Sequence, residues 1–257
     1  MSPPALAGRH VVVTRPARQT AHMAALIRAA GGEPVLFPAL EIVDAEDLQP
    51  VLALVDRLDS FALAIFVSAN AVDKALDLVL ARRAWPAGLR VATVGRGSER
   101  ALARHGFAAV IAPPERFDSE ALLDLPQLKD VRGKRVVIFR GGGGRELLGD
   151  TLSARGAVVE YAECYRRRRP QADVAPLLAL AAGRQLDAFT VTSSEGLANL
   201  HDMLGEAGLR WLKQTPLFAP HERIAAAARA LGVQTVVLTG PGDEGLVAGL
   251  AAFFAKV

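Results

Sequence analysis

Residues 135–170 read RVVIFRGGGGRELLGDTLSARGAVVEYAECYRRRRP and hold one complete βαβ unit. The apolar run at 136–139 has charge on one side and glycine on the other, which predicts a strand buried on both faces. Four glycines follow at 141–144, and a helical pattern begins near Arg145 and ends at Gly156. A second extended run comes next, and the segment leaves through a tyrosine and four consecutive arginines. The pattern predicts an α/β fold with a glycine loop between a strand and a helix.

The glycine loop is suited to an anion. Its backbone can turn sharply with its N–H groups uncovered, and the helix start directs further free N–H groups and a positive dipole end to the same place. GGGGRELL lacks the Gly-Lys-Ser/Thr ending of a nucleotide phosphate loop, and no acidic residue closes the following strand as a dinucleotide site requires. A glycine turn without a ligand explains the loop equally well, so the loop alone does not decide the function.

Composition excludes several classes of protein. The chain has 257 residues, 51% of them hydrophobic, which is enough for one large domain or two smaller ones. No apolar run approaches the roughly 18 residues of a membrane span, and the start lacks the layout of a signal peptide, so we expect a cytoplasmic protein. A single cysteine rules out internal disulfides. The five histidines are scattered and show no spacing typical of metal ligands, so we expect no metal site. A net charge of +3 with 5% aromatic residues does not indicate nucleic-acid binding.

One local pattern recurs along the chain: an apolar helix end, a glycine and then a β-branched run. Its four occurrences are ALIRAAGGEPVLFP, ALARHGFAAVIAP, TLSARGAVVEYAE and AARALGVQTVVLTG. Glycine just past a helix, followed by a strand, is typical of the αβ connection in a parallel sheet. The spacing between occurrences is unequal, which excludes a repeat solenoid. We therefore predict alternating strands and helices around parallel sheets.

The loops after six predicted strands share one chemistry, because each offers hydroxyl or glycine residues and several add an arginine. In a parallel sheet such loops gather at the carboxyl edge, where α/β proteins bind ligands. Helix capping explains any single serine or threonine, but six such loops together suit a wide polyanion. The candidate ligand-binding residues are Thr14, Arg15, Ser68, Ala69, Asn70, Gly95, Arg96, Arg140, Gly141, Gly142, Gly143, Ser193, Ser194, Pro220 and His221.

Two stretches interrupt the alternation of strands and helices, residues 38–43 and 161–170. They lie about 120 residues apart, roughly the length of one domain. We interpret them as two linkers that lie side by side. One domain would then be continuous over 44–160, and the other would combine 1–37 with 171–257.

Several segments, in order and over nearly the whole chain, resemble the uroporphyrinogen-III synthase family: VVVTRP, FVSANAV, RVATVGRGSERAL, the stretch quoted first, and DAFTVTSSEGLANL. The resemblance implies a lyase without cofactor or metal, built of two parallel-sheet α/β domains on a two-stranded linker, with the active site in the cleft between them. It implies cyclisation of hydroxymethylbilane, a linear tetrapyrrole with eight carboxylates, to uroporphyrinogen III with inversion of ring D and loss of water. We also expect a monomer that takes its substrate from hydroxymethylbilane synthase.

The resemblance implies that Tyr165 is the catalytic residue, assisting departure of the hydroxyl from ring A. A phenol can donate a hydrogen bond to a leaving oxygen. From the residues alone, a tyrosine packed beneath the linker explains this position as well. If the basic exit is extended, Arg167 and Arg169 share the face of Tyr165, and Arg167 is a candidate for attracting substrate carboxylates. The other two arginines more simply protect an exposed strand.

Two side chains near these segments are given no chemical role. Cys164 has no adjacent base, so we predict a small buried residue and not a nucleophile. His221 belongs to a loop that, by the resemblance, supplies backbone amides.

Two other functions fit the predicted layout. Two α/β domains on a double hinge are also compatible with a module that senses a small polyanion without catalysis. A nucleotide-sugar transferase is the enzymatic alternative, although one domain is small for it. Incubation with hydroxymethylbilane and separation of the product isomers would distinguish the three.

Overall fold

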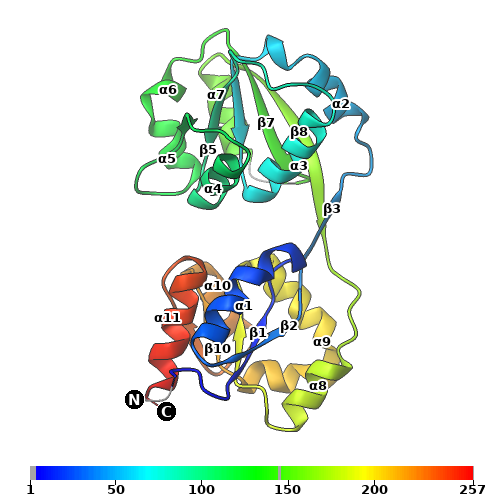
Figure 1. The fold of residues 1–257 in the computed structure, drawn as a ribbon, viewed down its shortest axis with the longest axis vertical. Coiled ribbons are helices and arrows are strands. Elements are labelled where there is room, and N and C mark those ends of the chain that lie inside the picture. Colours follow the sequence, from blue (N-terminus) through cyan, green and yellow to red (C-terminus); the bar gives the residue numbers. More distant parts are fainter. Residues whose placement is uncertain (1–3, 144–145, 257) are drawn as a thin grey trace. The chain divides into compact units, whose positions relative to one another are not determined.

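The computed structural model describes residues 4–143 and 146–256, and the chain forms two compact units. Unit 1 comprises Met1–Glu41 and Arg168–Val257, and unit 2 comprises Ile42–Arg167. Each unit has one sheet with helices packed on both faces (Figure 1). The predicted α/β class with parallel sheets is confirmed.

Unit 1 has a five-stranded sheet in the order β11-β10-β9-β1-β2, and its strand pairs are parallel. Alternate residues of β1 face opposite layers: Val12 packs with α9 and α10, whereas Val11 and Val13 pack with α1 and α11. The elements are β1 (His10–Val13), η1 (Ala17–Gln19), α1 (Thr20–Ala29), β2 (Glu33–Leu36), α8 (Ala175–Ala182), β9 (Ala188–Thr190), α9 (Ser194–Gln214), β10 (Leu217–Ala219), α10 (Glu222–Ala230), β11 (Val236–Leu238) and α11 (Gly242–Phe254).

Unit 2 has a six-stranded sheet in the order β3-β8-β7-β4-β5-β6, with parallel pairing from β8 through β6. Phe66 and Phe139 stack on the face covered by α2 and α3, with ring centroids 4.9 Å apart. The elements are β3 (Glu41–Asp44), α2 (Gln49–Asp56), η2 (Leu58–Ser60), β4 (Leu63–Phe66), α3 (Ala69–Leu80), β5 (Arg90–Thr93), α4 (Arg96–Arg104), β6 (Val110–Ile111), α5 (Ser119–Asp124), α6 (Pro126–Lys129), β7 (Arg135–Gly141), α7 (Leu147–Ala154) and β8 (Val158–Arg168).

The strand β8 is longer than the sequence pattern suggests. It continues to Arg168, so most of residues 161–170 extends a sheet strand, and β3 is its neighbour in the sheet. The described part of α7 begins at Leu147, and Gly144 and Arg145, where the sequence places the end of the glycine loop and the helix start, lie outside the described residues.

A β-bulge interrupts the pairing of β7 with β8. Arg140 pairs with Glu163, but the next residue, Gly141, pairs with Tyr165, so Cys164 is an extra residue in β8. Ala162, Cys164 and Tyr165 consequently all belong to the hydrophobic cluster on the α3 face. Strict alternation would place Tyr165 on the opposite face from Cys164, and the bulge therefore determines where the phenol lies.

Within the described residues, no helix is long and apolar enough to cross a membrane.

Candidate functional site

Unit 2 contains a cavity of about 180 Å³ at the carboxyl ends of its central strands, which we call the Tyr165 pocket. Its lining residues come from the ends of β4, β7 and β8. Further lining residues come from α5, from α7 and from the N-cap of α3. Its lining residues are Val67, Ser68, Ser119, Ile138, Arg140, Gly141, Gly143, Leu148, Tyr161, Tyr165 and Arg167. Five of the candidate residues, together with Tyr165, are thus brought together here.

Tyr165 is 4% exposed, and its hydroxyl oxygen lies 3.0 Å from Ser68 Oγ. Its ring lies directly against the backbone of Gly141: a Cβ atom at that position would come within 2.6 Å of two ring atoms. Only glycine leaves room for the ring, so this glycine of the loop serves the placement of Tyr165. Tyr165 and Ser68 both line the pocket, and a phenol hydroxyl can donate a hydrogen bond to a ligand there.

Ser68 is the N-cap of α3. Its Oγ accepts a hydrogen bond of 3.1 Å from the backbone N–H of Ala71, as serine commonly does at the first turn of a helix. The positive end of the α3 dipole therefore lies at the pocket wall, beside the hydroxyl of Tyr165. Ala69 and Asn70 form the first turn of the same helix.

Arg140 is held by two acidic side chains and one ring. Its Nε and Nη2 lie 3.1 and 2.9 Å from Glu163 Oε1, its Nη1 lies 3.5 Å from Glu146 Oε1, and its guanidinium carbon is 4.0 Å from the centroid of the Tyr161 ring. Burial, together with the Glu146 carboxylate, raises the pKa of Tyr161. Arg140 therefore already has acidic partners, and its weakest contact is the one to Glu146.

The glycine loop is tied to β8. The N–H of Gly142 donates to the Tyr165 carbonyl at 2.8 Å, and Arg167 Nη2 donates to the Gly143 carbonyl at 3.4 Å. Gly143 has a φ of +66°, a conformation that favours glycine. The Gly142 amide is thus used within the protein and is not directed at a ligand.

Not every candidate of unit 2 lines the Tyr165 pocket. Gly95 is the N-cap residue of α4, and the guanidinium carbon of Arg96 lies 4.8 Å from the centroid of the Phe117 ring. Arg96 and Phe117 border a separate depression of about 520 Å³, which Arg100 also lines. The loop after β5 therefore contributes to a neighbouring surface.

At the carboxyl edge of unit 1, two of the candidate hydroxyl groups bond to the protein backbone. Thr14 Oγ1 donates to the Thr190 carbonyl at 2.7 Å, and Ser193 Oγ accepts from the Gly196 N–H at 2.9 Å. Ser194 Oγ is buried and has no hydrogen-bond partner among the described residues. The loop after β10, Pro220 and His221, precedes α10, and the His221 side chain is exposed.

Arg15 forms the main electrostatic contact of this edge. Its Nη2 lies 2.9 Å from Asp243 Oδ1, and the Asp243 side chain is 7% exposed. The two groups form an ion pair without hydrogen-bond alignment, and Arg15 Nε has no partner among the described residues. Sequence reasoning missed Asp243, although the strand at 236–238 also ends in a hydroxyl and glycine loop, Thr-Gly-Pro-Gly, that could have signalled it.

The four arginines of the basic exit have different surroundings. Arg166 pairs with Glu46, Arg168 Nε lies 2.8 Å from Glu41 Oε2, and Arg169 Nη1 lies 2.7 Å from Asp202 Oδ2. Arg167 lines the pocket together with Tyr165, the residue whose face it was predicted to share. Arg169 lies past the end of β8, so the predicted alternation does not extend to it.

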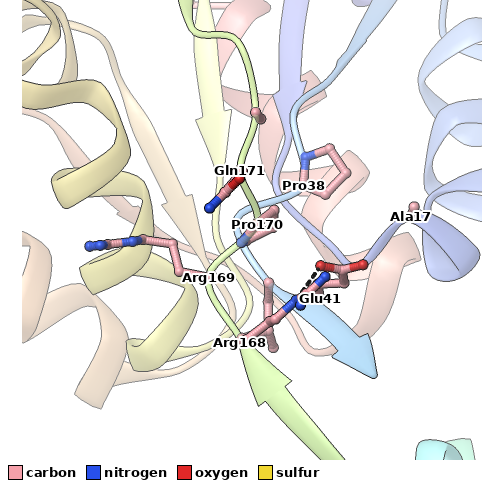
Figure 2. A pocket seen from close by; sticks show the side chains of 9 residues that line it. Ala17, Pro38, Glu41, Arg168, Arg169, Pro170 and Gln171 are labelled. Carbon is pink, nitrogen blue, oxygen red and sulfur yellow. Dashed lines mark hydrogen bonds and ion pairs between the residues drawn. The ribbon is translucent and has the colours of Figure 1, made fainter. Parts of the chain in front are cut away.

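The last two arginines border a depression of about 500 Å³ in unit 1 (Figure 2). Figure 2 shows Arg168 joined to Glu41 and Arg169 directed away from that pair. Both guanidinium groups thus have acidic partners. The residues lining this depression are Ala17, Pro38, Leu40, Glu41, Arg168, Arg169, Pro170, Gln171 and Ala172.

Cys164 is 1% exposed, and its thiol contacts the Ala162 carbonyl at 3.3 Å. Burial, with a smaller effect from Glu163, raises the pKa of the thiol to about 12. A thiol that remains protonated at neutral pH is a poor nucleophile, which agrees with the structural role expected for this residue. The described residues contain no group of three or more metal-ligating side chains.

The fold and the site define a class of protein: two α/β units, each with a parallel sheet whose carboxyl edge carries hydroxyl, glycine and arginine residues. A family model described as uroporphyrinogen-III synthase HemD matches residues 21–248. The uroporphyrinogen-III synthase of Salmonella typhimurium LT2 is 36% identical over 239 residues, covering 91% of this chain and 96% of the relative. That of Escherichia coli K12 is 33% identical over 236 residues, with the same shares covered. The chain belongs to the uroporphyrinogen-III synthase family.

Solved structures support the same fold. A mutant uroporphyrinogen III synthase from the extremely thermophilic bacterium Thermus thermophilus superposes with a TM-score of 0.63 at 20% identity, covering 97% of this chain and 100% of that one. The enzyme from Helicobacter pylori 26695 gives a TM-score of 0.60 at 13% identity, covering 96% and 98%.

Proposed function

We propose that this protein cyclises hydroxymethylbilane to uroporphyrinogen III, with inversion of ring D and release of water, and that Tyr165 is the acid that assists loss of the ring A hydroxyl. The observation that carries the assignment to Tyr165 is its placement. The phenol is buried against Gly141, yet Tyr165 lines the pocket, and its hydroxyl lies within hydrogen-bond distance of a helix cap, Ser68.

The proposed first step breaks the C–O bond of the hydroxymethyl group. The electron pair of that bond stays on the oxygen, which takes a proton from Tyr165 and leaves as water, and the remaining carbon becomes the electrophile that ring D attacks. Ring D loses a proton when the macrocycle is complete, which restores the proton of Tyr165. Proton donation by a positioned side chain typically accelerates such a step by about 100-fold or more.

We propose that the substrate carboxylates are bound by the strand-end loops of both sheets. In unit 2 the groups are Ser68 with the first turn of α3, Gly95 and Arg96 at the start of α4, and Arg167. In unit 1 they are Arg15 and the amides that begin α9 and α10. Arg140 would exchange its 3.5 Å contact with Glu146 for a substrate carboxylate. Helix N-termini and arginines are the groups that bind carboxylates best in proteins.

Binding of this kind would also explain the choice of product. Closure without inversion and closure with inversion differ in which carbon of ring D meets the electrophile. A protein that fixes several carboxylates fixes the ends of the chain, and positioning alone is worth several orders of magnitude in rate.

The test is Tyr165→Phe, assayed with freshly prepared hydroxymethylbilane and with separation of the isomers by chromatography. We expect turnover to fall at least about tenfold, because the proton donor is lost, while the thermal unfolding midpoint stays close to that of the parent. A folded variant with the parent's turnover would remove Tyr165 from the chemistry. A parent protein that formed no uroporphyrinogen III would refute the activity itself.

We further propose a cytoplasmic monomer that takes its substrate from hydroxymethylbilane synthase. Cys164 is a free thiol, which suits a reducing compartment. The most exposed large apolar residues lie on different elements, for example Val158 on β8 and Leu238 on β11, which is typical of a monomer. Size-exclusion chromatography at several concentrations tests the oligomeric state.

A further inference from the structure

Ser68 makes two contacts that share one hydroxyl group. Its oxygen accepts from the N–H of Ala71 at 3.1 Å and lies 3.0 Å from the hydroxyl oxygen of Tyr165. A serine hydroxyl has one proton and two lone pairs, and the Ala71 N–H uses one lone pair. Between Ser68 and Tyr165, either group can be the donor. The direction of this bond determines where the proton of Tyr165 points.

The reaction proposed above selects one direction. Tyr165 can give its proton to the leaving oxygen in the pocket only if its own oxygen accepts from Ser68. The order of donors is then Ala71 N–H to Ser68, Ser68 to Tyr165, and Tyr165 to the substrate. Each bond in such a chain polarises the next, so donation from the helix amide makes the serine a better donor.

The same arrangement favours the product of proton transfer. As Tyr165 loses its proton, negative charge develops on the phenol oxygen, at the atom that the Ser68 hydroxyl faces. The N-terminus of α3, a helix of 12 residues, lies behind that hydroxyl and adds its positive dipole end. An acceptor in place of Ser68 would instead turn the Tyr165 proton away from the substrate.

We infer that Ser68 is a positioning residue, which donates to the Tyr165 oxygen, directs the phenol proton into the pocket and stabilises the charge that develops on the phenol. This inference rests on the proposed role of Tyr165 and extends it, since the candidate role of Ser68 in the sequence was carboxylate binding.

The experiment is a double-mutant cycle in which turnover and KM are both measured. Ser68→Gly removes the hydroxyl at little capping cost, because glycine is tolerated at the N-cap. We expect turnover to fall about three- to tenfold, the value of one hydrogen bond, with KM nearly unchanged. Ser68→Thr keeps the hydroxyl and is expected to stay within about twofold of the parent. In the Tyr165→Phe background, Ser68→Gly should change turnover by less than about twofold, because residues that act through one group are not additive.

The possible outcomes test the role of Ser68 separately from the proposed role of Tyr165 as the acid. If Ser68→Gly slows the Tyr165→Phe variant as much as it slows the parent, or leaves the parent unaffected, the inference is overturned while Tyr165 keeps its role. If Tyr165→Phe itself has no effect on turnover, the proposed acid is wrong. Raised KM with unchanged turnover would return Ser68 to carboxylate binding.

Two further measurements distinguish positioning from a structural effect. The chain has two tyrosines, so ¹³Cζ-labelled tyrosine gives two resonances, and Tyr161→Phe assigns them. Ser68→Gly should shift the Tyr165 resonance and leave the Tyr161 resonance in place. Asp173, whose Oδ1 accepts from the N–H of Ala175 at the start of α8, supplies the control: Asp173→Gly removes a side-chain bond to a helix start in unit 1 and should not change turnover.

Discussion

The carboxyl edges of the two sheets are built on the same plan and have different chemistry. In unit 2, β8 contributes a buried phenol that borders a cavity together with Ser68. In unit 1, Thr14 bonds to the Thr190 carbonyl of the neighbouring strand, Ser193 caps α9, and Arg15 forms an ion pair with Asp243. The difference shows that strand-end loops of similar composition do not by themselves make equivalent sites. What distinguishes them is the side chain that a neighbouring element brings to the edge.

The largest effect is expected from Gly141→Ala, a substitution at the carboxyl edge of the unit 2 sheet. The added Cβ would lie 2.6 Å from the Tyr165 ring, inside a buried sheet where neither backbone can move easily. We expect a loss of about 1–3 kcal/mol in the free energy of unfolding and a fall in turnover to the level of Tyr165→Phe or lower. Urea unfolding and the cyclisation assay measure the two effects.

Gly88→Ala is the matched control for that substitution. A Cβ at Gly88 meets nothing within 4 Å, so stability and turnover should stay close to those of the parent. Equal effects at the two glycines would show that the Tyr165 ring does not depend on the glycine beneath it.

An intermediate effect is expected from Arg15→Gln, which acts on the unit 1 side. If Arg15 binds a substrate carboxylate, its loss should raise KM about tenfold, the usual value of a charge-assisted hydrogen bond, and should weaken the dependence of kcat/KM on ionic strength. Stability should also fall, because the buried Asp243 carboxylate loses its cation.

Arg9→Gln separates binding from stability. Arg9 Nη1 lies 2.8 Å from Asp187 Oδ1, but it precedes β1 at the amino edge of the same sheet, away from the strand-end loops. We expect this variant to lose stability with KM unchanged. A similar rise in KM in both variants would show that Arg15 contributes to folding and not to substrate binding.

The smallest effect concerns Cys164. A thiol in an unfolded chain ionises near pH 8.5, whereas burial raises the pKa of Cys164 to about 12 in the folded protein. Between these values the unfolded state has released its proton and the folded state has not, so stability should fall as pH rises through this window. Cys164→Ala lacks this contribution and should lose less stability between pH 8 and pH 10.5 in urea unfolding. Equal losses in both proteins would mean that the thiol does not titrate as its burial implies.

Much of the fold could be predicted from the sequence because its signals are local. The β-branched runs and the glycines after helices indicated parallel strands, and the strand β7 occurs where the apolar run at 136–139 predicts it. The Tyr165 pocket was predicted in part: Ser68, Arg140, Gly141, Gly143 and Arg167 line it, but Arg96 belongs to a neighbouring depression. Asp243 was missed because its partner, Arg15, lies more than 200 residues away in the chain, and a sequence pattern carries no information about such pairs.

The sequence by itself determined the alternation of strands and helices and the polar character of the strand ends, because hydrophobic periodicity and glycine conformation are properties of neighbouring residues. Only the tertiary structure decided the orientation of Tyr165 and the hydrogen-bond partner of the glycine loop. The extra residue at Cys164 changes the register between two strands, and the Gly142 amide bonds to the Tyr165 carbonyl. Register and cross-strand contacts depend on pairing between separate segments, and that pairing exists only once the sheet has formed.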